Sequence, residues 1–279
     1  MKIHIISLTI LVTLLSSCAS EFNRVYKTVD NDYKYEYAKE CFARGKFNQA
    51  ITLLQELVTI QKGTDNAQEC LYMLAMAEYC DRDYESASAT FKKYYQTYPK
   101  GVYAEQASFY IGQSLYQSTP EPRLDQSSTV NAISAYQDFL DFFPESNLKS
   151  KATERLFELT DKLVMKEYLS AKLYYTLGDY FLNCTFGGSN YEACIVTSEN
   201  ALKTYPFTKM REDFAVLIMK SKYELARQSV EEKKLERYRD AEDECYGFLN
   251  EYPDSPECKN AEKYIKKCRE ITGSTSELE

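Results

Sequence analysis

Tryptophan is absent from the sequence, and histidine occurs once, as His4 in an N-terminal stretch that we expect to be removed. Without histidine, the remaining chain cannot form a Ser-His-Asp or Cys-His catalytic site or a histidine-based metal site. A Walker loop, a G-x-G-x-x-G turn and a C-x-x-C pair are also absent. We therefore expect no enzymatic activity, no cofactor and no metal, although the many carboxylates leave a carboxylate-pair hydrolase as a formal alternative.

Glycine and proline are scarce, with 9 and 7 residues among 279, whereas tyrosine occurs 25 times and charged residues make up 27%. This composition favours an all-α fold over a sandwich or a barrel. The length suits one or two domains, or a single array of repeats. The formal charge is −8 and would be −9 without residues 1–17, which carry one lysine and no acid. Nucleic acid is excluded as a partner because it requires clustered lysine and arginine.

The N-terminus has the pattern of a cleaved signal. Lys2 is followed by an apolar run from Ile3 to Leu15 and then by Leu15-Ser16-Ser17-Cys18. That ending resembles the bacterial lipobox, which implies a diacylglycerol on the Cys18 thiol, cleavage before Cys18 and a further acyl chain, such as palmitate, on the new amino terminus. Several acyl chains anchor a protein stably. The alternatives are an ordinary secretory signal and an uncleaved membrane helix, but polar residues interrupt a run that is already short.

We expect a signal peptide at 1–17 and a lipidated N-terminus and tether at 18–31. Ala19 follows the cysteine, and no aspartate is there to signal retention in the inner membrane. The sequence therefore predicts a lipid-anchored protein on the periplasmic face of the outer membrane.

One sixteen-residue segment recurs five times without a gap. The copies are Phe47–Lys62, Tyr84–Pro99, Thr129–Pro144, Tyr191–Pro206 and Tyr238–Pro253. The fourth position is always small: Ala50, Ala87, Ala132, Cys194 and Ala241. Four copies end in an aromatic residue and a proline. Because a small residue permits close helix packing and proline ends a helix, each copy predicts the second helix of a hairpin.

The copies begin 37, 45, 62 and 47 residues apart, near or above the ~34-residue tetratricopeptide period. The pattern resembles tetratricopeptide repeats with insertions and predicts a helical-hairpin solenoid of about five repeats plus a C-terminal capping helix at Glu257–Ile271. Apolar stripes predict first helices at Tyr33–Arg44, Glu69–Tyr79, Ala104–Tyr116 and Met210–Arg227. Residues 118–128 predict an exposed loop. The fourth hairpin could turn at Gly178 or at Gly187-Gly188.

We expect an N-terminal repeat half at 32–145, a C-terminal half with the bridging helix at 146–271, and a tail at 272–279. Eight cysteines follow Cys18. Pairs ten residues apart on one helix are ~15 Å apart, beyond the ~7 Å limit for a disulfide. Only Cys184 and Cys194, on either side of Gly187-Gly188, could be bridged. Cys194 replaces alanine in the repeat, which favours a buried free thiol.

The bridging stretch Ala152–Tyr175 follows no repeat consensus. Its residues Ala152, Thr153, Arg155, Leu156, Leu159, Asp161, Leu163, Glu167, Tyr168, Ala171, Tyr174 and Tyr175 resemble, at these spacings, the corresponding passage of the BamD family, lipoproteins of the outer-membrane β-barrel assembly machine. The lipobox, the Gly45-Lys46-Phe47 turn and the aromatic-proline endings also fit that family. The insertion before Tyr191 and the many cysteines depart from it.

The resemblance implies a non-enzymatic scaffold. Its C-terminal hairpins, from Met210 to Cys268, would dock a periplasmic domain of a BamA-like barrel protein, and its N-terminal hairpins would lie near unfolded outer-membrane β-barrel proteins and help their insertion. The repeat register places eight residues on a peptide-binding groove lined by first helices: Tyr35, Lys39, Tyr72, Met76, Tyr79, Phe109, Gln113 and Tyr116. Each could instead be an interhelical packing contact.

Two other functions stay open. One is a periplasmic tetratricopeptide adaptor for cell-wall or polysaccharide-uptake machinery, because similar repeats occur in envelope coordinators. The other is a glycan-binding lipoprotein, which the lack of tryptophan disfavours.

Overall fold

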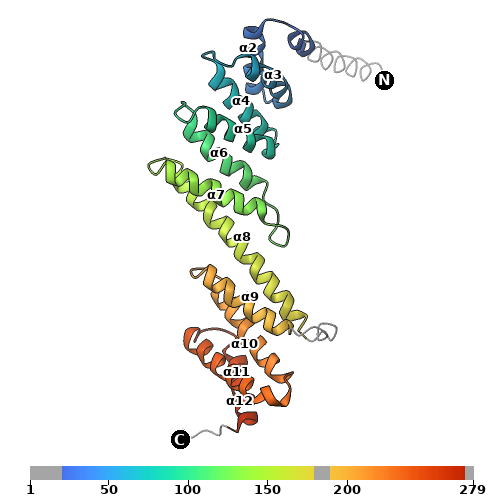
Figure 1. Ribbon diagram of the computed structural model, residues 1–279, viewed down its shortest axis with the longest axis vertical. Helices are drawn as coiled ribbons and strands as arrows, with labels where there is room; N and C mark the ends of the chain where they lie inside the picture. Colours follow the sequence, from blue (N-terminus) through green and yellow to red (C-terminus); the bar gives the residue numbers. More distant parts are fainter. Residues whose placement is uncertain (1–20, 179–188, 274–279) are drawn as a thin grey trace, which may run out of the picture. The chain divides into compact units, whose positions relative to one another are not determined.

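The computed structural model describes residues 21–178 and 189–273, and all regular secondary structure in these two ranges is α-helical (Figure 1). The predicted all-α fold is therefore confirmed. The helices are α2 (Asn31–Ala43), α3 (Phe47–Ile60), α4 (Ala67–Cys80), α5 (Tyr84–Thr97), α6 (Ala104–Gln117), α7 (Ser127–Phe142), α8 (Lys149–Thr176), α9 (Asn190–Thr204), α10 (Arg211–Arg227), α11 (Glu231–Glu251) and α12 (Cys258–Thr272). A short helical stretch at 21–26 precedes them.

The five sequence copies form the second helices of five hairpins, namely α3, α5, α7, α9 and α11. Positions 4, 8 and 11 of each copy point into the core, as helical spacing requires. These residues are at most 3% exposed: Ala50, Leu54, Leu57; Ala87, Phe91, Tyr94; Ala132, Tyr136, Phe139; Cys194, Ser198, Ala201; Ala241, Cys245, Phe248. The fourth copy has the smallest set, Cys194, Ser198 and Ala201.

Four of the second helices end in the same turn. The residue before each proline leaves the helical region, with φ between −124° and −130° and ψ between 60° and 66° at Tyr98, Phe143, Tyr205 and Tyr252. A following proline disfavours the α region, which explains where these helices stop. In each turn, the carbonyl of the aromatic residue then accepts a hydrogen bond from the N–H three residues later, at Gly101, Ser146, Thr208 and Ser255. Each aromatic-proline ending is thus a β-turn.

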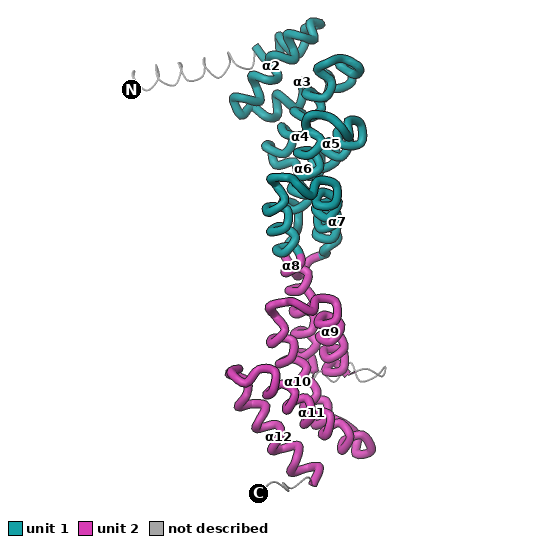
Figure 2. Tube along the Cα trace, turned by 90° about the vertical axis from the view of Figure 1, so that its left-hand side faces the viewer, with its two compact units in different colours: residues 1–120, 125–159 teal, residues 121–124, 160–279 magenta. Residues whose placement is uncertain are grey.

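The chain forms two compact units, shown in different colours in Figure 2. Unit 1 comprises residues 1–120 and 125–159, and unit 2 comprises residues 121–124 and 160–279. The division falls inside α8, whereas the sequence placed its two functional halves on either side of residue 145. The reason is packing: Ala152 and Leu159 of α8 belong to a cluster with Phe109 and Phe139, whereas Val164 belongs to a cluster of unit 2.

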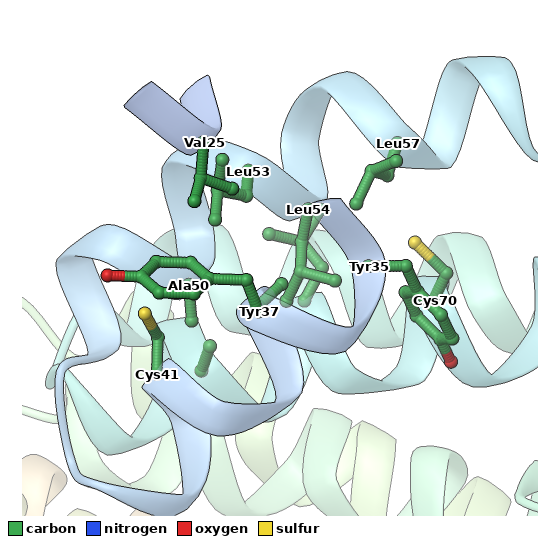
Figure 3. Packing of buried hydrophobic residues seen from close by; sticks show 12 residues of the cluster. Val25, Tyr35, Tyr37, Cys41, Ala50, Leu53, Leu54, Leu57 and Cys70 are labelled. Carbon is green, nitrogen blue, oxygen red and sulfur yellow. The ribbon is translucent and has the colours of Figure 1, made fainter. Parts of the chain in front are cut away.

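The first hairpin illustrates how a unit is held together. Val25, Tyr35 and Leu54 belong to one buried cluster, and Tyr35 lies beside Cys70 of the next hairpin (Figure 3). Lys34 is only 2% exposed, and its Nζ donates to both carboxylate oxygens of Glu56, at 2.9 and 3.0 Å. The pair joins α2 to α3, because a buried ammonium group requires a charged partner.

In unit 2, α8 is followed by a turn at Leu177 and Gly178, and α9 begins at Asn190. A Cβ atom at Gly178 would lie 2.1–2.7 Å from three ring atoms of Tyr191, whose side chain is buried. Gly178 is therefore required for the contact between the end of α8 and the start of α9. The other possible turn, at Gly187-Gly188, lies outside the described residues.

Replacing Gly178 with alanine should destabilise unit 2 by about 1–3 kcal/mol, because the buried Tyr191 ring must move to admit the methyl group. Urea unfolding followed by circular dichroism would measure the change. Gly247, where no atom lies within 4 Å of the added Cβ, provides a control. Its replacement by alanine should leave stability unchanged or raise it. Equal stability of the two variants would contradict the packing role of Gly178.

Several sequence expectations fall outside the described residues: the signal peptide at 1–17, lipidation at Cys18, the thiol of Cys184, and the tail beyond Gly273. Within the described residues, Cys194 is a buried free cysteine. Its pKa is raised by burial. It occupies the small position of its repeat, as the sequence predicted.

Candidate functional site

The predicted groove on the first helices begins at α2. Tyr35 is 2% exposed and belongs to the core. Burial is the main cause that raises the pKa of its phenol, and the nearby Glu69 carboxylate raises this pKa further. Lys39 is half-buried; its Nζ lies 5.0 Å from the centre of the Tyr35 ring and 3.0 Å from Glu36 Oε1. Only Lys39 of this pair therefore reaches the surface.

On α4, the predicted residues Tyr72, Met76 and Tyr79 are half-buried. Tyr72 stacks on Tyr103 with ring centroids 4.4 Å apart, and burial raises its pKa to about 12. Tyr79 contacts Tyr110 edge-on at 5.1 Å. These geometries are typical of stable aromatic packing. The three side chains thus hold hairpins together and offer only part of their surface to a ligand.

On α6, Phe109 and Gln113 are buried, at 2% and 4% exposure. Gln113 accepts a hydrogen bond from the Tyr136 hydroxyl at 2.9 Å. Tyr116 is half-buried: its hydroxyl donates to Glu158 at 2.6 Å and accepts from Arg155 at 3.1 Å. The structure therefore joins Tyr116 to α8 rather than leaving it free for a peptide.

Tyr35, Phe109 and Gln113 consequently line no open groove in this structure, and the five other predicted residues are only half-buried. The eight residues lie on α2, α4 and α6, which are the first helices of their hairpins. The tetratricopeptide register did not show that large aromatic side chains fill the space between those helices.

The structure instead has a hollow between two second helices of unit 1. A groove of about 550 Å³ lies between α5 and α7, with α6 as its floor. We call it the α5–α7 groove. Its lining comprises Ser88, Lys92, Tyr95 and Gln96 from α5, Ser108, Ile111 and Leu115 from α6, and Asn131, Ser134, Ala135, Asp138 and Phe142 from α7.

The lining of the groove is mixed in character. Ser88 of α5 and Ser108 of α6 are buried hydroxyl residues. Phe142 of α7 is 65% exposed, and its ring centroid lies 6.4 Å from that of Tyr95 of α5. A second hollow, of about 310 Å³, shares Phe142 and continues along the α7–α8 turn.

A second candidate surface appears when the five second helices are compared. Positions 6, 10 and 13 of every copy and the residue that directly follows the copy are exposed, and we call each set of four an outer stripe. Each stripe lies on one second helix and the turn after it: Thr52, Glu56, Thr59, Gly63 for α3; Ala89, Lys93, Gln96, Lys100 for α5; Ser134, Asp138, Asp141, Glu145 for α7; Val196, Asn200, Lys203, Phe207 for α9; and Asp243, Gly247, Asn250, Asp254 for α11.

The outer stripe of α9 differs in carrying large apolar side chains. Phe207, in the turn after Pro206, is 96% exposed, and Val196 is 50% exposed. The equivalents of Phe207 in the other aromatic-proline turns are Lys100, Glu145 and Asp254. This difference is visible in the aligned sequence, but only the structure shows that the position faces solvent.

Across 21–178 and 189–273, no three residues of the types His, Cys, Asp and Glu gather in a way that could hold a metal ion. No helix in the same part of the chain has both the length and the apolar character needed to cross a membrane.

Comparison with known sequences gives a family match and two relatives. Residues 28–184 match the family YfiO, described as outer membrane lipoprotein. A protein of Aquifex aeolicus, provisionally named outer membrane protein assembly factor BamD, is 28% identical over 145 residues, which are 51% of this chain and 46% of that protein. The outer membrane protein assembly factor BamD of Caulobacter vibrioides is 19% identical over 172 residues, covering 61% and 56%. The chain thus spans about half the length of the curated relatives it matches.

Comparison with solved structures finds the TPR2AB-domain:pHSP90-complex of yeast Sti1, with a TM-score of 0.39 and 14% identity over 85% of this chain and 98% of that one. A likeness of this size carries no argument about function.

Proposed function

Because this chain belongs to the YfiO family of outer membrane lipoproteins, we propose that it is a non-enzymatic assembly factor for outer-membrane β-barrel proteins. The family match carries this proposal, since it covers α2 to α8. Both curated relatives are named as assembly factors of this kind. In this role the helical hairpins provide surfaces for partner proteins rather than a reaction centre.

The proposed location of the protein is the periplasmic face of the outer membrane, where acyl chains on Cys18 would anchor it. The family description as a lipoprotein supports it, as does the lipobox-like sequence before Cys18. α2 begins at Asn31, thirteen residues after this cysteine in the sequence, so the first hairpins would lie near the membrane.

Unit 2 would dock the periplasmic domain of a BamA-like barrel protein. The outer stripe of α9 supports this role, because a fully exposed phenylalanine stands where three other repeats carry a charge. Exposed aromatic side chains of this kind are typical anchors in protein interfaces. Lys203 and Lys209 lie on either side of Phe207 in the sequence and would suit acidic groups on the partner.

Replacing Phe207 with aspartate should lower recovery of the barrel protein about tenfold or more, because the change removes an apolar anchor and introduces a charge that the interface must desolvate. The measurement is affinity purification of the intact lipoprotein from gently solubilised membranes, followed by quantification of the co-purified proteins. Val230→Asp provides the matched control, since Val230 is also an exposed apolar residue of unit 2, at 63%.

Equal loss in the two variants, or no loss in either, would contradict docking through Phe207. If wall enzymes or glycan transporters were consistently recovered from the unmodified protein instead of a barrel protein, the assembly function itself would be wrong. Depletion of the lipoprotein should also lower many outer-membrane barrel proteins together.

A further inference from the structure

We propose that the surface formed by Tyr26, Val29 and Tyr33 lies against the phospholipid headgroups of the membrane and orients the first hairpin relative to it. We call these three residues the N-terminal apolar surface. The proposal rests on the proposed function for the acyl anchor at Cys18, which brings the chain to the membrane. The contact itself is inferred from the exposure, the chemistry and the position of the three side chains.

The three side chains are exposed to an unusual degree for their type. Val29 is 94% exposed, Tyr26 46% and Tyr33 44%. Single exposed apolar side chains are normal on a protein surface, but a group of them marks a contact with another molecule or with a membrane. Here the group is confined to the short segment from residue 26 to residue 33.

The exposure of Val29 follows from the way α2 begins. Asp30 is the N-cap of α2, and its side chain accepts a hydrogen bond from the N–H of Tyr33 at 3.0 Å. An apolar residue just before an N-cap often packs against the residue four positions into the helix. Here that residue is Lys34, whose ammonium group instead pairs with Glu56 at 2.9 Å. Val29 therefore has no apolar partner at the start of its own helix.

Tyr26 is held in place but not covered. Its ring stacks with that of Phe22, with centroids 6.1 Å apart and planes 19° apart. Lys34 Nζ lies 5.9 Å from the centre of the Tyr26 ring. The preceding residue, Val25, is fully buried in the core of the first hairpin (Figure 3). The helical stretch at 21–26 thus packs onto the hairpin through Val25 and leaves Tyr26 at the surface.

The N-terminal apolar surface is close in sequence to the proposed anchor. The chain from Cys18 to Glu21 reaches at most roughly 11 Å, and the helical stretch from 21 to 26 adds about 8 Å. Tyr26 would therefore lie within about 19 Å of the acylated cysteine, whose acyl chains are in the bilayer. So short a distance brings the surface to the headgroups without any further movement of the chain.

The chemistry of the surface suits the headgroup level of a membrane. Tyrosine is enriched at membrane–water interfaces, where its ring can leave water while its hydroxyl remains hydrated. Residues 21–33 carry two basic and three acidic side chains. This segment therefore has no excess of positive charge with which to attract anionic lipids. The contact would depend on the valine and the tyrosine rings.

The test uses the complete lipoprotein in vesicles of phosphatidylethanolamine and phosphatidylglycerol. The chain contains no tryptophan, so Tyr33→Trp introduces a single fluorescent probe. Part of the phospholipid carries bromine near the headgroup end of its acyl chains and quenches a tryptophan at that depth. The control is Val130→Trp, because Val130 is 54% exposed and lies near the start of α7, two hairpins further along unit 1.

The tryptophan of Tyr33→Trp should lose about half of its emission or more in brominated vesicles, because aromatic side chains settle at the headgroup level. The tryptophan of Val130→Trp should lose none. Adding Val29→Asp to Tyr33→Trp should restore the emission, because a carboxylate resists leaving water. Val29 is almost fully exposed, so this change should not affect folding. Quenching should be the same in vesicles without phosphatidylglycerol.

Three results would overturn the proposal. The first is equal quenching in Tyr33→Trp and Val130→Trp. The second is quenching that persists after Val29→Asp, since the short distance to the anchor would then explain it alone. The third is blue-shifted emission from Tyr33→Trp that brominated lipid does not quench, which would show that a second copy of the chain covers this surface.

These outcomes are separable from failure of the proposed function. Flotation of the vesicles shows whether the protein is anchored. An anchored protein in which Tyr33→Trp is not quenched would contradict the membrane contact alone, whereas a protein that does not float would contradict the acyl anchor and the contact together. If depletion of the lipoprotein left outer-membrane barrel proteins unchanged, the assembly role would be wrong, and the quenching data would still decide the contact.

Discussion

Replacing Tyr136 with alanine is expected to lower the free energy of unfolding by about 3–5 kcal/mol, the range for removing a buried aromatic side chain. Tyr136 is fully buried in α7 and packs against Phe109, with ring centroids 5.8 Å apart. At Gly112, α6 comes so close that an added Cβ would lie 2.9 Å from the Tyr136 ring. Because α6 and α7 already lie this close at Gly112, they cannot move together to fill the space that the ring leaves. The loss is large because a typical domain is stable by only about 5–15 kcal/mol.

Urea unfolding followed by circular dichroism would measure this loss. Tyr136→Phe keeps the ring and removes only the hydroxyl that donates to Gln113, so it should cost about 1–3 kcal/mol, because the buried amide loses its partner. Adding Gly112→Ala to Tyr136→Ala should be much less harmful than Gly112→Ala alone, since the methyl group then enters the vacated space. Additive effects of the two changes would contradict this packing.

Alkaline pH is expected to destabilise the protein steeply. Burial raises the pKa of the Cys70, Cys245 and Cys268 thiols from 9.0 to about 12, and that of the Tyr72 and Tyr264 phenols from 10.0 to about 12. Between these values the unfolded chain ionises these groups while the folded chain keeps them protonated, so the unfolded chain binds fewer protons. The stability that these groups provide is complete below about pH 9 and is lost as the pH rises toward 12.

Each thiol that is ionised only in the unfolded chain lowers the free energy of unfolding by about 1.4 kcal/mol per pH unit. Urea unfolding at pH 8, 9, 10 and 11, with reductant present, would give this slope. Replacing all three thiols with alanine should reduce the slope above pH 9 by about 4 kcal/mol per pH unit. An unchanged slope in the triple variant would show that these thiols already contact water.

The second helices could be predicted from the sequence because the same pattern of small, apolar and aromatic-proline positions recurs in the five copies. The second helices were predicted to within two residues at the start of every copy except the last, where α11 begins seven residues early at Glu231. No repeat position corresponds to that extension, so comparison of copies could not reveal it. The resemblance to the BamD family, carried by the bridging stretch, was confirmed by the family match and both relatives.

The candidate site was less predictable, for a physical reason. Helical spacing shows which residues share a face but not how far a neighbouring helix covers that face. Tyr35 and Phe109 satisfy the register of an inner surface and are nevertheless buried. The α5–α7 groove depends on the distance between two helices 43 residues apart in sequence, counted from Tyr84 to Ser127, and no local pattern encodes this distance.

The turn of the fourth hairpin shows the same limit. Both glycine positions were compatible with a turn. The close contact with the Tyr191 ring explains why a glycine is needed at position 178. This reason could not be found locally, because Tyr191 lies beyond the insertion in the sequence.

The outer stripes have a consequence for how such a protein can change over generations. In every copy, positions 4, 8 and 11 are buried, while positions 6, 10 and 13 and the residue directly after the copy are exposed to solvent. Apart from Glu56, which pairs with the buried Lys34, substitutions at these positions are expected to alter stability by less than about 0.5 kcal/mol. A duplicated hairpin can therefore acquire a new binding preference, as the basic outer stripe of α5, the acidic one of α7 and the partly apolar one of α9 illustrate, while selection for folding acts on other residues of the same repeat.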